Sequence, residues 1–283
     1  MRIDAHQHIW SLARGDYGWL TPDLGVLYRD FNLEDLAPLL ERHDIHHTVL
    51  VQAAPTVAET EFCLAAATRD SRIAGVVGWI DFGASDARPT LERLATHPKL
   101  KGIRPMIQDI EQDDWMLSES FAPVFEAMVR LDLCFDALVL PRHLPNLATL
   151  CARHPELKVV VDHGAKPRIR DHGTPQENFS SWRRDLTVIA RSTKAYCKLS
   201  GLVTEANADW GVDDLRPYFD VILAEFGPQR LLWGSDWPVV CLAGDYDRWW
   251  DATAELLKSL STEDRDAILG QNALRFYGLD LTA

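Results

Sequence analysis

Short apolar runs alternate with longer amphipathic runs along the whole of the chain. The short runs are four to eight residues long, are rich in Val and Leu, and mostly lack the alternation of a half-exposed strand. Uninterrupted runs of this kind are typical of strands covered on both faces, as in a parallel sheet. We therefore predict strands at residues 2–5, 48–52, 73–80, 100–104, 133–138, 157–162, 195–199 and 230–233.

The longer runs carry helix signals. Thr56 and Glu59 have the spacing of a capping box at the start of one helix. Ser261 can cap a terminal helix that ends near Gly278. The pattern predicts helices at residues 33–43, 58–69, 87–96, 120–131, 144–153, 180–192, 215–226, 246–259 and 263–275.

Eight strands that alternate with helices predict an α/β fold, a (β/α)8 TIM barrel, as a single domain over residues 1–283. An open doubly wound sheet is the competing architecture, but no GxGxxG phosphate-binding motif follows any predicted strand. Repeats, low-complexity tracts and Pro/Gly linkers are absent from the sequence. The stretches 10–28 and 166–178 are long for barrel loops, so each is a candidate for covering a substrate.

Composition and charge exclude several classes of protein. Hydrophobic residues make up 47% and charged residues 25% of the chain, which is ordinary for a globular protein and excludes a disordered or fibrous one. The net charge of −13 argues against nucleic-acid and anionic-membrane partners. The chain has no apolar run of about 18 residues, the length that a membrane span needs. Its five cysteines form no CxxC pair, so we expect free thiols in a cytoplasmic protein.

Chemically active residues stand where the predicted strands end. In a (β/α)8 barrel these ends surround the active site. A chance set of strand ends would not combine several histidines with Asp, Arg and Lys, so the pattern predicts an enzyme. The residues concerned are His6, His8, Gln52, Trp79, Asp81, Arg104, Asp136, Asp162, His163, Lys198, Ser200 and Asp236.

His6 and His8 are two residues apart on an extended segment, so their side chains point to the same side and can meet one cation. The alternative is that both are bonded to neighbouring backbone. Barrel closure places strand 8 beside strand 1, which brings Asp236 toward the two histidines. Its carboxylate can bind a metal, or hold and deprotonate a water, whereas the structural alternative is a helix cap or turn.

Three further strand-end residues each have a functional and a structural interpretation. His163 is a third metal ligand, a group that polarises a carbonyl, or a core histidine whose ring nitrogens are hydrogen-bonded within the protein. Arg104 is costly to bury at a barrel mouth, so it binds a substrate oxygen or pairs with an acid such as Asp81 or Asp136. Lys198 has the same alternatives and a weaker case for function.

These motifs together resemble the amidohydrolase superfamily, and within it the amidohydrolase-related branch (amidohydrolase 2). This branch holds 2-pyrone-4,6-dicarboxylate lactonase and the sugar-acid lactonases such as L-fuconolactonase. The resemblance extends from the first residue to the segment 270–277. It rests on IDAHQH at 3–8, VGWID at 77–81, Arg104, VDHG at 161–164, KLSG at 198–201 and WGSDWP at 233–238.

The resemblance implies a hydrolase that opens a small lactone, most of all a sugar-acid lactone. Asp236 would activate the water, and His6, His8 and His163 would contact the substrate carbonyl. Arg104 and Lys198 would assist by binding ring oxygens or a carboxylate.

The resemblance also bears on metal content. Binuclear members of the superfamily use a bridging carboxylated Lys or a Glu, whereas here the predicted strand 100–104 ends in Arg104 and the predicted strand 133–138 carries Asp136. A single divalent ion, zinc or manganese, held by His6, His8 and Asp236, or no ion at all, is therefore expected.

Further residues are predicted to bind the small-molecule lactone. Trp10, Trp79 and Trp237 can pack on sugar C–H faces or simply form the wall of the barrel mouth, and Gln52 adds a polar group. The acidic chain favours a neutral sugar lactone over a dicarboxylated pyrone. A decarboxylase or amidase on the same barrel, and a catalytically empty binding scaffold, are the alternatives.

Overall fold

Eight parallel strands form one sheet in the order β1 to β8 in the computed structural model, which describes residues 1–171 and 176–281. The sheet closes where β8 meets β1: the Asp236 N–H donates to the His6 carbonyl (2.8 Å), and the His8 N–H donates to the Trp237 carbonyl (2.7 Å). The predicted (β/α)8 barrel is thus confirmed. The strands are β1 (Arg2–Gln7), β2 (Ile45–Val51), β3 (Ile73–Gly78), β4 (Leu100–Ile103), β5 (Cys134–Ala137), β6 (Lys158–Val161), β7 (Tyr196–Leu199) and β8 (Leu231–Trp233).

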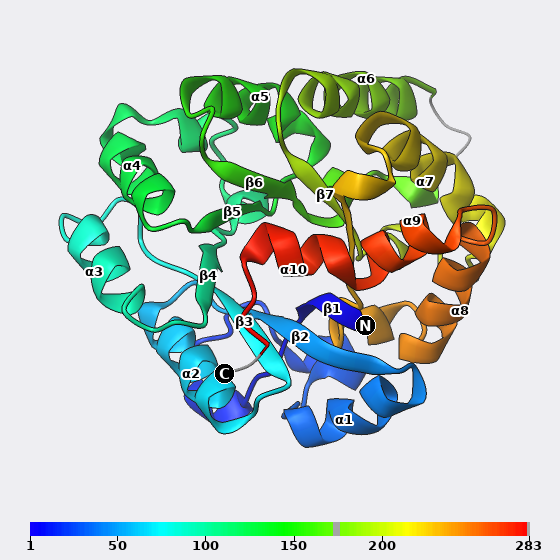
Figure 1. The fold of residues 1–283 in the computed structure, drawn as a ribbon, viewed down its shortest axis with the longest axis horizontal. Coiled ribbons are helices and arrows are strands. Elements are labelled where there is room, and N and C mark those ends of the chain that lie inside the picture. The colour runs from blue at the N-terminus through cyan, green and yellow to red at the C-terminus, as the bar shows by residue number, and fades with distance from the viewer. Residues whose placement is uncertain (172–175, 282–283) are drawn as a thin grey trace.

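Helices surround this barrel on the outside (Figure 1). The terminal helix expected over residues 263–275 is instead three segments with a π-helical turn in the middle. At this turn Gly270 packs against the start of β1, and a Cβ atom there would lie 2.5 Å from the Met1 carbonyl oxygen. The helices are α1 (Leu33–Arg42), α2 (Val57–Arg69), α3 (Ala87–Leu94), α4 (Ala122–Arg130), α5 (Leu144–Arg153), α6 (Gln176–Ser192), α7 (Val212–Phe226), α8 (Tyr246–Leu256), α9 (Thr262–Asp266), the π turn (Ala267–Gln271) and α10 (Asn272–Tyr277).

The barrel interior has an apolar part and a polar part. Side chains alternate between the two faces of a strand, so every second residue points inward. The inner apolar cluster includes Cys134 on β5 and Val160 on β6. Two residues further along the chain, Asp136 on β5 and Asp162 directly after β6 point inward as well, and Lys198 joins them from β7 at ion-pair distance. A buried layer of charges therefore lies above the apolar layer.

Helix α10 closes the end of the barrel opposite the site. It crosses the front of the barrel in Figure 1, beside the N-terminus. Its Phe276 and Tyr277 belong to the inner apolar cluster, and the Tyr277 hydroxyl donates to Asp136 Oδ2 (2.7 Å). Any ligand must consequently enter from the other end, where the strands terminate.

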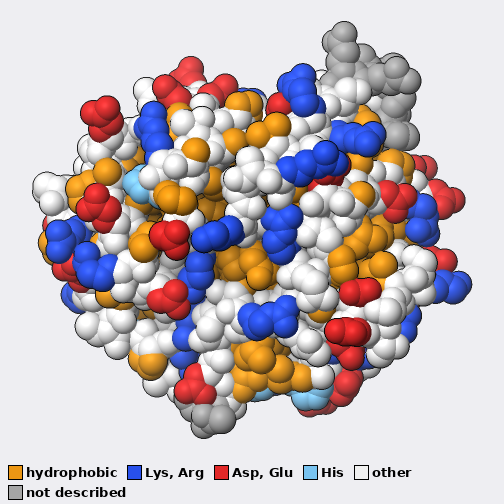
Figure 2. All heavy atoms as spheres, turned by 45° about the horizontal axis from the view of Figure 1, so that its top comes forward, with side chains coloured by type: hydrophobic (Ala, Val, Ile, Leu, Met, Phe, Trp, Pro, Cys, Tyr) orange, Lys and Arg blue, Asp and Glu red, His pale blue; other side chains and the backbone are white. Residues whose placement is uncertain are grey.

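The molecular surface mixes both signs of charge. On the face shown in Figure 2, Lys and Arg side chains form a band across the middle, with Asp and Glu side chains on both sides of it. The acidic excess of the chain is therefore not uniform over the surface. Within the residues that the structure describes, no helix is long and apolar enough to cross a membrane.

Candidate active site

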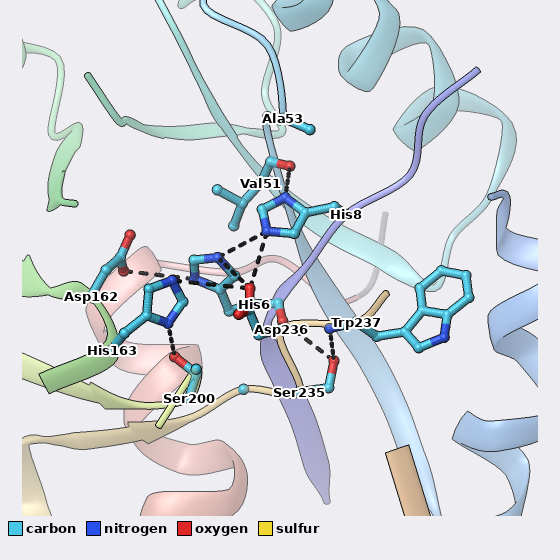
Figure 3. A network of polar contacts seen from close by, with 12 residues as sticks. His6, His8, Val51, Ala53, Asp162, His163, Ser200, Ser235, Asp236 and Trp237 are labelled. Carbon is cyan, nitrogen blue, oxygen red and sulfur yellow. Dashed lines mark hydrogen bonds and ion pairs between the residues drawn. The ribbon is translucent and has the colours of Figure 1, made fainter. Parts of the chain in front are cut away.

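Three imidazoles converge on the carboxylate of Asp236 at the strand ends (Figure 3). The Asp236 Oδ1 atom lies 3.3 Å from His8 Nε2, 3.6 Å from His6 Nε2 and 4.0 Å from His163 Nε2. The two Nε2 atoms of His6 and His8 are 3.2 Å apart. All four residues are at most 4% exposed. The structure thus brings together the residues for which sequence analysis predicted chemistry on strands 1, 6 and 8.

Local backbone features aim these side chains. The pairing of β1 with β2 is irregular between Asp4 and Gln7, which allows His6 to face the interior although its neighbour Ala5 also does. Asp236 has a left-handed backbone (φ 57°), which Asp tolerates better than most residues. Gly234 lets β8 approach β1 closely, because a Cβ atom there would lie 2.6 Å from His6 Cβ.

Burial favours the neutral form of the imidazoles, and a hydrogen bond sets the tautomer of His8. The Val51 carbonyl can only accept, so the Nδ1–H of His8 donates to it (2.7 Å) and leaves the Nε2 lone pair facing Asp236. Burial lowers the pKa of His163 to about 4, against the opposing attraction of Asp236 and Asp162. Burial likewise lowers the pKa of His6 and of His8. Neutral imidazoles can ligate a metal or accept a proton.

Asp236, by contrast, is ionised. Burial alone would raise the pKa of this carboxyl, but the positive charge that His163, His8 and His6 carry when protonated outweighs burial and holds the pKa below its ordinary value, so a proton in this cluster resides on an imidazole and not on Asp236. Its Oδ1 atom faces the imidazoles. Within the described residues no hydrogen bond to Oδ2 is found, and Asp236 lines the cavity described below, so this oxygen is free to accept from a water.

Two cations contact the two nitrogens of His6. Lys198 Nζ lies 3.0 Å from His6 Nδ1, and Arg104 Nη1 lies 3.3 Å from His6 Nε2. Lys198 is fully buried and pairs with Asp136 (2.6 Å) and Asp162 (3.0 Å). After burial, the Lys198 charge is the largest cause of the low pKa of His6.

The acid beside Arg104 is Asp162 (3.8 Å), not Asp81 or Asp136 as the sequence indicated. Arg104 also donates through Nη2 to the Gln52 carbonyl, and the Gln52 amide donates back to the Arg104 carbonyl (2.9 Å). Asp81 instead accepts from the Gly83 N–H. Gln52 therefore holds Arg104 in place.

The cluster fits one divalent cation. His6 Nε2, His8 Nε2 and Asp236 Oδ1 form a triangle with sides of 3.2, 3.3 and 3.6 Å. Tetrahedral zinc with bonds of about 2.0–2.1 Å needs ligand atoms about 3.3–3.4 Å apart. His163 also lies within reach, because one ligand atom each of His6, His163 and Asp236 lies within 4.8 Å of the others. The donor types, imidazole nitrogen and carboxylate oxygen, suit the same ion.

A cavity of about 270 Å³ opens above this cluster. His8, Arg104, His163 and Asp236 reach it from the barrel. The rest of its wall comes from loops and comprises Trp19, Leu24, Ala53, Met106, Gln108, Asp109, Leu138, Lys166, Val239 and Leu242. Both long loops contribute, residues 10–28 through Trp19 and Leu24 and residues 166–178 through Lys166. Residues 172–175 of the second loop lie outside the described residues.

The tryptophans and the glutamine singled out from the sequence lie outside this cavity lining. Trp10 is 1% exposed and packs edge-on against Trp19 and Phe31. Trp237 is also buried and packs against Phe31. Gln52 is fully buried, and Trp79 is partly buried. Substrate contact by these four residues stays a prediction, whereas Trp19, which sequence analysis did not single out, faces the cavity.

A buried carboxylate anchors Trp19. The Trp19 Nε1–H donates to the Ala53 carbonyl (2.7 Å), while the Ala53 N–H donates to Glu59 Oε1 (3.0 Å). The Tyr17 hydroxyl donates to Glu59 Oε2 (2.8 Å). The predicted capping box is therefore only half formed: Thr56 caps α2, but the Glu59 side chain holds the covering loop instead.

The comparisons with known proteins agree with this geometry. The model of the amidohydrolase family (Amidohydro_2) matches residues 3–279. The chain belongs to the amidohydrolase family. The resemblance inferred from the strand-end motifs is thus confirmed.

Two full-length relatives of this amidohydrolase are lactonases by name. An L-fucono-1,5-lactonase of Burkholderia ambifaria is 42% identical, with 99% of this chain and 96% of that protein covered. The L-fucono-1,5-lactonase of Burkholderia multivorans is 38% identical over the same shares. A crystal structure of a Burkholderia multivorans amidohydrolase with bound zinc superposes with a TM-score of 0.91 at 37% identity, covering 99% of this chain and all of that one. These relatives support the prediction of a lactone-opening hydrolase.

Proposed function

We propose that this amidohydrolase hydrolyses a sugar-acid lactone, L-fucono-1,5-lactone in the first instance, with Asp236 as the general base. The observation that carries the proposal is an ionised carboxylate with one free oxygen, set among neutral imidazoles at the floor of a small cavity. The full-length similarity to the two L-fucono-1,5-lactonases supports the choice of substrate.

Lactone hydrolysis is an acyl transfer to water. Asp236 Oδ2 accepts a hydrogen bond from the water and takes its proton as the water oxygen attacks the carbonyl carbon. Arg104 and His163 line the same cavity and stabilise the negative charge that develops on the carbonyl oxygen. When the tetrahedral intermediate collapses, the ring C–O bond breaks, and the proton held by Asp236 passes to the leaving alkoxide. The product is the open hydroxy acid.

His6, His8 and Asp236 would hold one divalent ion, which when bound supplies Lewis-acid polarisation of the carbonyl. Lys198 and Arg104 both lie beside His6, and their positive charges repel a divalent ion bound to the same histidine. Asp236 provides a base, and Arg104 and His163 provide donors, without the ion. We therefore propose that the metal enhances the reaction and is not indispensable.

The balance of charge favours a neutral substrate. Arg104 and Lys166 line the cavity, but so do Asp109 and Asp236. Arg104 has Asp162 nearby, and Lys166 has Glu205 at 3.4 Å. The cavity thus offers no surplus of positive charge to hold a dicarboxylate, whereas hydroxyl groups can bond to either sign.

Replacing Arg104 by Met is expected to lower kcat/KM for the sugar lactone. The loss should correspond to about 1–3 kcal/mol of transition-state stabilisation, which one or two hydrogen bonds from a charged group contribute. Steady-state kinetics at two salt concentrations checks this. A much larger loss that shrinks as salt rises would indicate an anionic substrate and contradict the neutral one.

Elemental analysis of the purified protein is expected to find at most about one tightly held divalent ion per chain, with part of the activity left after chelation. Two stoichiometric ions per chain, with activity that follows both, would contradict the mononuclear site.

A panel of sugar-acid lactones in a pH-indicator assay tests the proposed function, since ring opening releases acid. We expect L-fucono-1,5-lactone to be among the best substrates. Carbon dioxide release from an aromatic acid, with no acid released from any lactone, would favour a decarboxylase instead.

A further inference from the structure

The turn after β6 carries two cavity residues on a costly backbone. Four consecutive residues, His163 to Lys166, have left-handed φ values of 54°, 57°, 62° and 51°, and only Gly164 among them adopts such values freely. The Lys166 N–H donates to the His163 carbonyl and closes the turn (2.9 Å). Strained backbone of this kind persists where the surrounding structure requires it, commonly at functional sites.

This turn directs both side chains to the cavity. His163 points to the floor, where its Nδ1 pairs with the Ser200 hydroxyl (2.9 Å) and its Nε2 faces Asp236. Lys166 lies in the wall formed by loops. The turn therefore ties a residue beside the reacting carbonyl to one at a distance from it.

The Lys166 ammonium is held in place but has spare hydrogen-bonding capacity. Its Nζ donates to Gln108 Oε1 (3.1 Å) and lies 3.4 Å from Glu205 Oε1. An ammonium group has three N–H donors, so one is left for a ligand. Gln108 and Asp109 line the same cavity, where the Gln108 amide can donate or accept and the Asp109 carboxylate can accept further hydrogen bonds. Trp19 and Leu24 add apolar surface to the same cavity lining.

We propose that Lys166 is a specificity-determining residue that donates a hydrogen bond to a hydroxyl group of the sugar lactone, with Gln108 orienting it. The inference rests on the proposed function and names the part of the substrate that the wall recognises. The charge of Lys166 is already balanced by Glu205, so the bond it offers suits a neutral hydroxyl. Trp19 lines the same cavity and offers an apolar surface for the C–H bonds of the sugar ring.

Two lactones and two variants test the proposal. L-Fucono-1,5-lactone and δ-valerolactone share a six-membered ring, but only the first has hydroxyl groups. Lys166→Met removes the donor, while Arg168→Met removes a charge from the same loop at a residue that pairs with Asp171 and lies outside the cavity lining. We expect Lys166→Met to lower kcat/KM on the sugar lactone about 10–100-fold and on δ-valerolactone less than threefold. Arg168→Met should match the wild type on both.

Equal losses of Lys166→Met on both lactones would overturn the proposal, because they indicate a general effect through the turn and His163. An unchanged Lys166→Met enzyme on the sugar lactone would overturn it as well. If the wild type opens only the sugar lactone, that result already shows that catalysis requires the hydroxyl groups. The proposal is then tested on the sugar lactone alone, where Lys166→Met should lose activity and Arg168→Met should not. A wild-type enzyme that opens neither lactone contradicts the proposed function itself, which is a distinct result.

Discussion

Replacing Asp236 by Asn is expected to lower kcat on the sugar lactone by about 10²–10⁴-fold with the fold intact. The amide has nearly the shape of the carboxylate, but it cannot take a proton from water. The hydrogen bond from the Asp236 backbone N–H to the His6 carbonyl remains, so barrel closure is preserved. Steady-state kinetics and a thermal unfolding curve on the same preparation measure both properties.

Asp81→Asn is the matched control for this variant. Asp81 also follows a barrel strand, but it is exposed and accepts from the Gly83 N–H outside the cavity lining. Its turnover should equal that of the wild type. Near-normal turnover by the purified Asp236→Asn protein would remove Asp236 from the mechanism.

The largest expected effect on stability is that of Lys198→Met. Burial favours the neutral amine, yet Asp136 and Asp162 outweigh burial and raise the pKa of Lys198, so the charge is kept inside the barrel. Methionine fills the space but leaves Asp136 without its cation and Asp162 with Arg104 alone, at 3.8 Å. Breaking a buried ion pair on one side costs about 3–5 kcal/mol. Urea unfolding at neutral pH measures the loss, and the exposed pair of Lys194 and Glu156 supplies a control, because Lys194→Met should change stability little.

The loss should depend on pH with a definite sign. In the wild type, burial opposes ionisation of Asp162, but Lys198 and His6 hold its pKa well below the ordinary value. That contribution to stability is present above the unfolded-state pKa and is lost as the pH falls. In Lys198→Met both carboxyl pKa values rise, and protonation relieves their repulsion in the folded state. The stability difference between the two proteins should therefore shrink from pH 7 toward pH 4, and a difference that grows would contradict this explanation.

The barrel and the centre of the site could be predicted because short-range rules determine them. Apolar runs identify the eight strands, and the ends of parallel strands must meet at one end of a barrel. This places His6, His8 and Asp236 together once β8 closes on β1. The inward direction of Asp136 and Asp162 could not be predicted in the same way. Side chains alternate between the two faces of a strand, but both faces of β5 and β6 are apolar, so the sequence does not show which residues face the barrel interior.

The wall of the cavity could not be predicted because it depends on contacts between distant residues. Trp19 faces the cavity since Ala53 and, behind it, Glu59 hold its loop, and no local pattern distinguishes it from Trp10. The ion-pair partner of Arg104 was predicted wrongly for a similar reason. Asp81 follows the strand next to that of Arg104, but its carboxylate accepts a hydrogen bond in an exposed turn. Asp162 points into the barrel and lies beside Arg104.

The central claim is that Asp236 and its histidines open a neutral sugar-acid lactone. Measuring kcat/KM for L-fucono-1,5-lactone and for 2-pyrone-4,6-dicarboxylate side by side, with the same enzyme preparation, tests it most directly. The balanced charges of the cavity predict a strong preference for the sugar lactone. A strong preference for the dicarboxylate would contradict the account.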